Sequence, residues 1–110
     1  MRKYAEKFAD EIGLTGELRK LYIEGKIYYR EISSGMSLFP QKDVTETQVL
    51  EFIKVIPRLD SYDVCGAHII SENIIKTIVD KFPNARFVDL NPEEYKIWNK
   101  KIIEIGGRID

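Results

Sequence analysis

The feature that most constrains the fold is the stretch from Tyr62 to Leu90, where two short apolar runs flank a helical pattern. The runs extend from Val64 to Ile70 and from Ala85 to Leu90. Between them, apolar residues recur at helical spacing, namely Ile74, Ile75, Ile78, Val79 and Phe82. A connection long enough for a helix favours parallel pairing of the two strands, and such crossovers are almost always right-handed. The stretch therefore predicts a βαβ unit.

The N-terminal part of the chain predicts two short helices. Tyr4, Phe8 and Ile12 lie on one face of a helix that begins near Arg2. Thr15 is a candidate N-cap for a second helix, which is expected to end at Gly25. The two helices are expected to form a helical hairpin or elbow.

A β-hairpin is predicted after these helices. The segment from Lys26 to Ile32 is rich in β-branched and aromatic residues, and two serines and a glycine follow it as a turn. The return strand extends from Met36 to Phe39, and Pro40 is expected to break it.

Residues typical of helix N-caps predict where two further helices begin. Asp43 and Thr45 are alternative N-caps of a helix that ends before Pro57. Asn91 is the N-cap of the last helix, with proline at the first helical position and a glutamate two residues later to complete a capping box. The glycine pair at 106 and 107 is expected to end that helix, with no strand after it.

These elements predict a single α/β or α+β domain over residues 1–110. Its expected order is an N-terminal helical pair, the hairpin, a helix, the βαβ unit and a C-terminal helix, with about four strands. Helices are expected to pack on at least one face of the sheet.

Composition excludes several functional classes. Seventeen basic residues against eighteen acidic ones leave a net charge of -1, which argues against nucleic acid or an anionic membrane as the partner. The single cysteine, Cys65, rules out an internal disulfide and fits a cytoplasmic location. The charged N-terminus lacks the apolar core of a signal peptide, and no apolar run is long enough to span a membrane. No motif predicts a cofactor or a metal site.

Polar residues cluster where the two predicted parallel strands end, which is where ligands bind in such units. His68, Ser71 and Asn73 follow the first strand, and Asp89 and Asn91 follow the second. His68 could act as acid or base with Asp89 to orient it, while Ser71, Asn73 and Asn91 could bind a ligand. The alternatives are a structural histidine satisfied by backbone groups and polar side chains that only cap helices.

The neighbouring Cys65 invites interpretation as a nucleophile with His68 as its base. Residues three apart in a strand point to opposite faces, so the two side chains meet only if the strand has already broken at Gly66. An inert buried thiol is the favoured interpretation.

The hairpin carries a second candidate site. Tyr28, Tyr29, Arg30, Met36 and Phe39 are residue types that are enriched at the centres of protein interfaces. Because adjacent strand residues face opposite sides, at least one of the two tyrosines should lie outside the core.

The sequence thus predicts a small cytoplasmic binding or regulatory module without catalytic activity, whose contact surface includes residues 26–39. Its partner is expected to be another protein or a second copy of the chain. The alternative is a small enzyme or a binder of a nucleotide or metabolite, with its site at the ends of strands 62–70 and 85–90. RNA is a minor option, supported only by basic residues between the aromatic ones of the hairpin.

Overall fold

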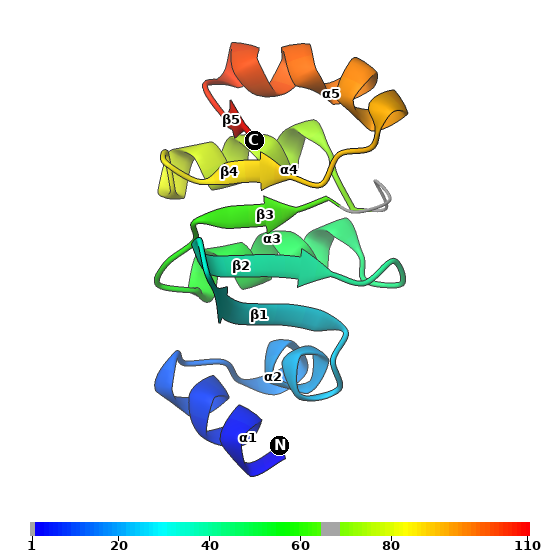
Figure 1. Ribbon diagram of the computed structural model, residues 1–110. Helices are drawn as coiled ribbons and strands as arrows, with labels where there is room; N and C mark the ends of the chain where they lie inside the picture. Colours follow the sequence, from blue (N-terminus) through cyan, green and yellow to red (C-terminus); the bar gives the residue numbers. More distant parts are fainter. Residues whose placement is uncertain (1, 65–68) are drawn as a thin grey trace.

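One mixed sheet organises the chain in the computed structural model, which describes residues 2–64 and 69–110 (Figure 1). In chain order the elements are α1 (Arg2–Glu11), α2 (Gly16–Ile23), β1 (Ile27–Ile32), β2 (Gly35–Pro40), α3 (Glu46–Val55), β3 (Ser61–Asp63), α4 (Glu72–Lys81), β4 (Arg86–Val88), α5 (Pro92–Ile105) and β5 (Arg108–Ile109). They form a single α/β domain, as the sequence predicts.

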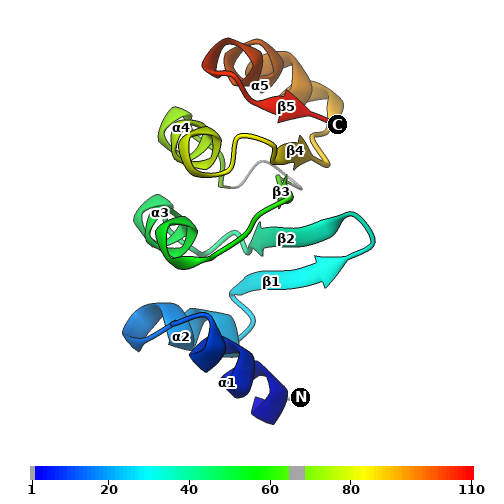
Figure 2. The same cartoon turned by 90° about the vertical axis from the view of Figure 1, so that its left-hand side faces the viewer.

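The strands lie in the sheet in their chain order, β1-β2-β3-β4-β5. β1 and β2 form the predicted antiparallel hairpin, and every later pair is parallel. Successive right-handed crossovers that step in one direction along a sheet place their helices on the same face. Figure 2 shows this result, with α3, α4 and α5 on one side of the sheet and no helix of the described residues on the opposite face. We call the uncovered side the open face.

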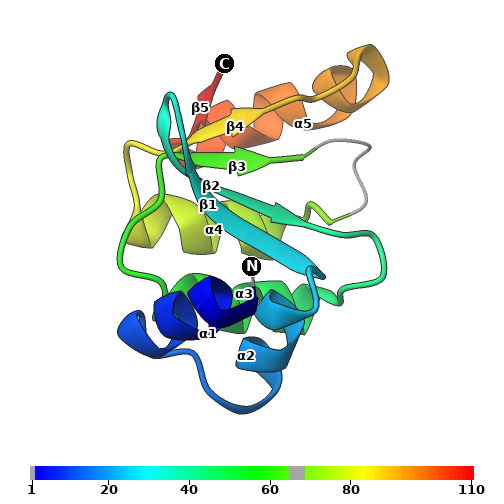
Figure 3. The ribbon, with the colours of Figure 1, turned by 60° about the horizontal axis from the view of Figure 1, so that its bottom comes forward.

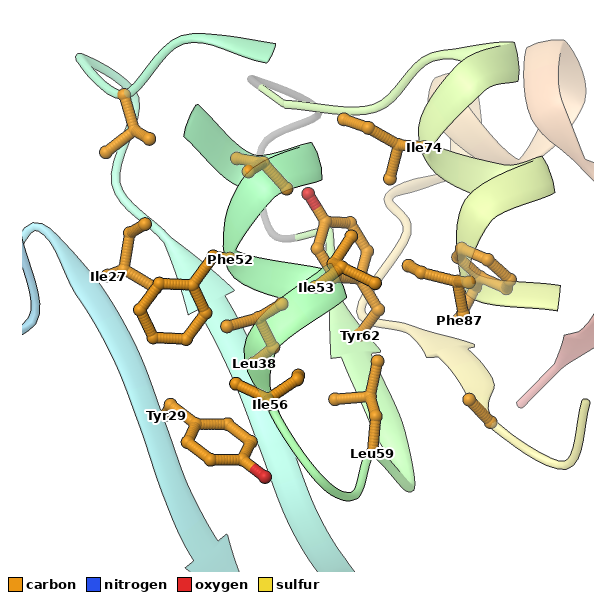
Figure 4. Close-up of a cluster of buried hydrophobic side chains, with 14 of the residues drawn as sticks. Ile27, Tyr29, Leu38, Phe52, Ile53, Ile56, Leu59, Tyr62, Ile74 and Phe87 are labelled. Carbon is orange, nitrogen blue, oxygen red and sulfur yellow. The ribbon is translucent and has the colours of Figure 1, made fainter. Parts of the chain in front are cut away.

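The core fills the space between the sheet and the helices (Figure 4). Leu38 and Tyr62 project from neighbouring strands toward Phe52 and Ile53 of α3, whereas Phe87 lies beside α4. Tyr62 contacts Phe87 edge to face, with 6.0 Å between the ring centroids. Burial of these large side chains is the main stabilising contribution available to a domain of this size.

A lysine ties two helices of this layer together. The Nζ of Lys81, in the last turn of α4, donates to the carbonyl oxygens of Ile53, Lys54 and Ile56 at 3.0, 2.5 and 2.9 Å. The last carbonyl groups of a helix have no partner within it, so a cation placed there satisfies them and favours the helix dipole. Lys81 therefore caps α3 from the neighbouring helix.

The capping residues lie where the sequence predicts. Thr45, and not Asp43, is the N-cap of α3, in a capping box with Gln48. Asp43 instead accepts a hydrogen bond from Lys26 at 2.7 Å, and this contact lowers the pKa of Asp43. Asn91 caps α5 in a second capping box.

The strands of the predicted βαβ unit are parallel neighbours but are shorter than expected. β3 contains only Ser61–Asp63 and β4 only Arg86–Val88, so the ranges 62–70 and 85–90 are wrong as strand boundaries. Ile69 and Ile70 lie in the loop before α4. A fifth strand, Arg108–Ile109, was not predicted, because two residues are too few to give an alternating pattern.

The N-terminal helices extend the helical layer beyond the sheet. α1 and α2 lie together at the β1 end of the molecule, far from the C-terminus (Figures 1 and 3). Phe8 of α1 packs against Tyr22 of α2 and Tyr29 of β1, each at a centroid distance of 6.0 Å. These aromatic contacts attach the helical pair to the hairpin.

Candidate functional site

The open face of the hairpin carries a cluster of aromatic, aliphatic and arginine side chains. Tyr28, Arg30 and Ile32 alternate along β1 on this face, and Phe39 lies opposite Tyr28 on β2. Tyr28 is 42% exposed and Ile32 39% exposed. We call these four residues the hairpin patch.

Contacts within the hairpin patch hold its side chains in place. The rings of Tyr28 and Phe39 stack with a centroid distance of 6.0 Å and an interplanar angle of 30°. The guanidinium carbon of Arg30 lies 5.6 Å from the centroid of the Tyr28 ring. A patch that is already ordered loses less conformational entropy when it binds.

The structure divides the predicted contact residues between two faces. Tyr28, Arg30 and Phe39 lie on the open face, whereas Tyr29 and Met36 point toward the helices. Tyr29 is only 2% exposed, and its hydroxyl donates to the Arg58 carbonyl oxygen at 2.5 Å. Burial raises the pKa of the Tyr29 phenol. Tyr29 therefore belongs to the core, and the expectation that one tyrosine of the pair lies outside the core is confirmed for Tyr28.

Two cavities, each of about 320 Å³, lie between the N-terminal helices and β1. Both are lined by Tyr4 of α1, Tyr22 of α2, and Tyr29 and Arg30 of β1. One continues toward the N-terminal end of β1, at Gly25, and the other toward Met36 of β2. Sequence reasoning missed this region, because no local signal places α1 beside the edge of the hairpin.

A row of side chains crosses the open face in register. Arg30 pairs with Ser37, Ser37 with Ser61, Ser61 with Arg86, and Arg86 with Arg108. The two serines are buried although none of the helices that the structure describes covers them. Within the described residues, the Ser61 hydroxyl is the buried side-chain polar atom that has no hydrogen-bond partner.

Replacing Ser61 with alanine is expected to raise the free energy of unfolding by about 1 kcal/mol, because the variant no longer buries an unsatisfied hydroxyl. Urea unfolding followed by circular dichroism measures the change. Ser37→Ala is the matched control, since Ser37 is the neighbour in the same row and is 8% exposed. A loss of stability in Ser61→Ala would show that the hydroxyl does find a partner.

Two of the polar side chains that follow the parallel strands β3 and β4 cap helices. The Ser71 hydroxyl accepts a hydrogen bond from the Ile74 amide at 3.2 Å, and the Asn91 side chain accepts one from the Glu94 amide at 2.8 Å. Asn73 is exposed at the start of α4, and its backbone carbonyl oxygen accepts a hydrogen bond from the Thr77 hydroxyl. The predicted ligand-binding side chains Ser71 and Asn91 are therefore occupied by the ends of their own helices.

His68 and Cys65 lie outside the described residues, so the pairing of His68 with Asp89 stays a prediction. The parallel pairing of β3 and β4 on which that prediction depends is confirmed. Asp89 follows β4 with a positive φ of 62° and is exposed. Within residues 2–64 and 69–110, no group of three or more His, Cys, Asp or Glu side chains could hold a metal ion.

No helix in the described parts of the chain is long and apolar enough to cross a membrane. Comparison with known proteins adds no assignment, because no family model, no curated protein and no solved structure matches this chain.

Proposed function

We propose that this chain is a non-catalytic binding or regulatory module of the cytoplasm that contacts a protein partner through the hairpin patch. The observation that carries the proposal is the position of that patch. Tyr28, Arg30, Ile32 and Phe39 are grouped on a sheet face that no helix in the described part of the chain covers. Aromatic and arginine side chains held in a rigid group are the usual energetic centre of a protein interface.

Charge and local structure support a protein as the partner. Arg30 lies beside the Tyr28 ring, and within the described residues no carboxylate forms an ion pair with it. A carboxylate of a partner would form an ion pair with the Arg30 guanidinium, and an aromatic ring would stack on it, when the interface is removed from water. A second copy of the chain is the other candidate, and it would present the same patch symmetrically.

Affinity capture from cells that express the protein tests the proposal. The double variant Tyr28→Ala with Arg30→Ala is expected to lose at least about tenfold of the captured partner, because it removes the centre of the patch. The control is Tyr95→Ala with Ile97→Ala on α5, whose wild-type side chains are 46% and 67% exposed. Circular dichroism establishes that both variants are folded.

If both double variants retain the same partner to the same extent as the wild type, the hairpin patch is not the contact surface. Light scattering after size exclusion distinguishes the two kinds of partner, because a self-associating chain shows a dimer mass that the hairpin double variant lacks.

A further inference from the structure

The outer edge of β1 presents unpaired backbone groups. In an antiparallel pair, residues whose backbone groups face the partner strand alternate with residues whose backbone groups face away from it. The Lys26 carbonyl accepts a hydrogen bond from the Gln41 amide at 2.8 Å, so Lys26 is a residue of the first kind. Pro40, which has no amide hydrogen, lies opposite Ile27, as that alternation requires. The amide and carbonyl groups of Ile27, Tyr29 and Glu31 therefore point away from β2.

These outward groups have no partner in the part of the chain that the structure describes. β1 is the first strand of the sheet, and no strand within the described ranges pairs with its other edge. Within residues 2–64 and 69–110, no hydrogen bond reaches the outward-facing backbone of Ile27, Tyr29 or Glu31. A row of alternating donors and acceptors at strand spacing is complementary to one kind of chemical group, another extended backbone.

Space for such a backbone lies beside the same edge. The two cavities of about 320 Å³ follow β1 from Gly25 to Glu31. Tyr4 and Tyr22 form the opposite wall, and Tyr4 is 76% exposed. We call this space the edge groove. Its aromatic wall suits the apolar side chains that every second residue of an added strand would direct toward the helices.

The shape of the edge groove selects a single chain segment and not the sheet edge of a second copy. The groove is bounded by β1 on one side and by α1 and α2 on the other. An occupant must therefore have no strand paired on its far side. The β1 strand of a second copy is paired with its own β2, so it does not meet this condition.

Charge specifies the other face of the occupant. Arg30 lines both cavities and directs its side chain to the open face. Its guanidinium has no carboxylate partner in the described residues, so a carboxylate on the occupant would pair with it. Residues that alternate between apolar and acidic satisfy both faces of the groove.

We propose that the edge groove binds an extended peptide segment of the partner as an added β-strand, with apolar side chains toward Tyr4 and Tyr22 and a carboxylate toward Arg30. The inference rests on the proposed binding function and adds the mode of recognition. Backbone hydrogen bonds supply affinity in this mode, and the alternate side chains supply specificity.

Selection from a displayed library of random peptides about eight residues long, within the usual range of strand lengths, provides the probe. The expected consensus alternates apolar and acidic residues. In two-dimensional 1H–15N correlation NMR spectra of the wild-type protein, the selected peptide is expected to shift the backbone amide signals of Ile27, Tyr29 and Glu31. A selection that returns no alternating sequence, or shifts confined to other elements, overturns the proposal.

The variant Glu31→Pro tests the backbone hydrogen bonds directly. The Glu31 amide points away from β2, so proline there removes a donor to the peptide without removing a bond of the hairpin. Peptide affinity is expected to fall at least about tenfold, whereas Glu31→Ala, which removes the same side chain but keeps the amide, is expected to change it less than about threefold. Equal affinity in the two variants contradicts the proposal.

A measurement on the wild-type protein covers the case in which Glu31→Pro does not fold. N-methylation of the selected peptide, one position at a time, is expected to abolish binding at alternate positions only, because every second amide of an added strand faces β1. Uniform tolerance of N-methylation overturns strand addition.

Failure of this inference is distinguishable from failure of the proposed function. A partner that is retained by Glu31→Pro but lost by the Tyr28 and Arg30 double variant docks on the hairpin patch alone. In that case the binding function stands and the strand addition is wrong. A partner that both variants retain refutes both.

Discussion

Replacing Gly35 with alanine is expected to lower the free energy of unfolding by about 3 kcal/mol. Gly35 follows the hairpin turn with a φ of 114°, a conformation that L-residues rarely adopt. A β-carbon at this position would also overlap the side chain of Asp60. Backbone strain and a steric collision therefore act on the same residue.

The collision is costly because Asp60 joins the hairpin to the start of β3. Its Oδ2 accepts hydrogen bonds from the Met36 amide at 2.7 Å and from the Arg58 Nε at 2.9 Å. The Asp60 amide in turn donates to the Met36 carbonyl oxygen at 2.8 Å. Moving the carboxylate away from a new methyl group breaks the first of these bonds and leaves a partly buried amide without its acceptor.

Gly13→Ala separates the two contributions. Gly13 also has a positive φ, of 84°, but a β-carbon there would meet no atom within 4 Å. This control is expected to lose only about 1 kcal/mol, the cost of the backbone conformation alone. Urea unfolding of both variants gives the comparison, and equal losses would show that Asp60 moves without cost.

The local elements of this fold follow from short sequence signals. Thr45 with Gln48 and Asn91 with Glu94 form capping boxes that were recognisable in the sequence, because the residues that make the hydrogen bonds are three positions apart. The parallel pairing of β3 and β4 follows from the length of the connection between them. Such features depend on neighbours in the chain, so a single sequence is sufficient to predict them.

Features that depend on distant contacts were not predictable in the same way. Alternation separates Tyr28 from Tyr29, but only the packing of Phe8 and Phe52 against Tyr29 shows which of the two is buried. β5 is a strand because Phe87 provides an edge for Ile109, not because of its own two residues. The edge groove requires α1 to lie beside β1, an arrangement that no local pattern encodes.

The chain order of the strands links fold to candidate function. Parallel sheets are usually covered on both faces, whereas this sheet keeps its helices on one side. On the open face, the small side chains of Ser37 and Ser61 lie between Arg30 of the hairpin and Arg86. The features that favour a binding module therefore arise from the topology and are concentrated at its hairpin end.

Alkaline pH is expected to destabilise the protein through Tyr62. Its side chain is fully buried, and its hydroxyl donates to the Ile69 carbonyl oxygen at 2.5 Å. Burial, with a smaller contribution from the charge of Asp63, raises the pKa of the Tyr62 phenol far above its ordinary value of 10.0. Because the raised pKa belongs to the folded state, the contribution of this group is complete below about pH 10 and is lost as the pH rises further.

The expected loss from Tyr62 is about 2 kcal/mol between about pH 10 and about pH 11.5, since one such group contributes about 1.4 kcal/mol per pH unit. Tyr62→Phe is expected to be about 1 kcal/mol less stable at neutral pH, because the Ile69 carbonyl loses its donor, but to lose less stability above pH about 10. Urea unfolding across this pH range measures how the free energy of unfolding falls with pH in the wild type and in Tyr62→Phe.

Phe52→Leu is the control, because it weakens the same core without removing a phenol and should keep the wild-type dependence of stability on pH. Parallel curves for wild type and Tyr62→Phe would mean that Tyr62 ionises at the same pH whether the chain is folded or unfolded, which its complete burial opposes.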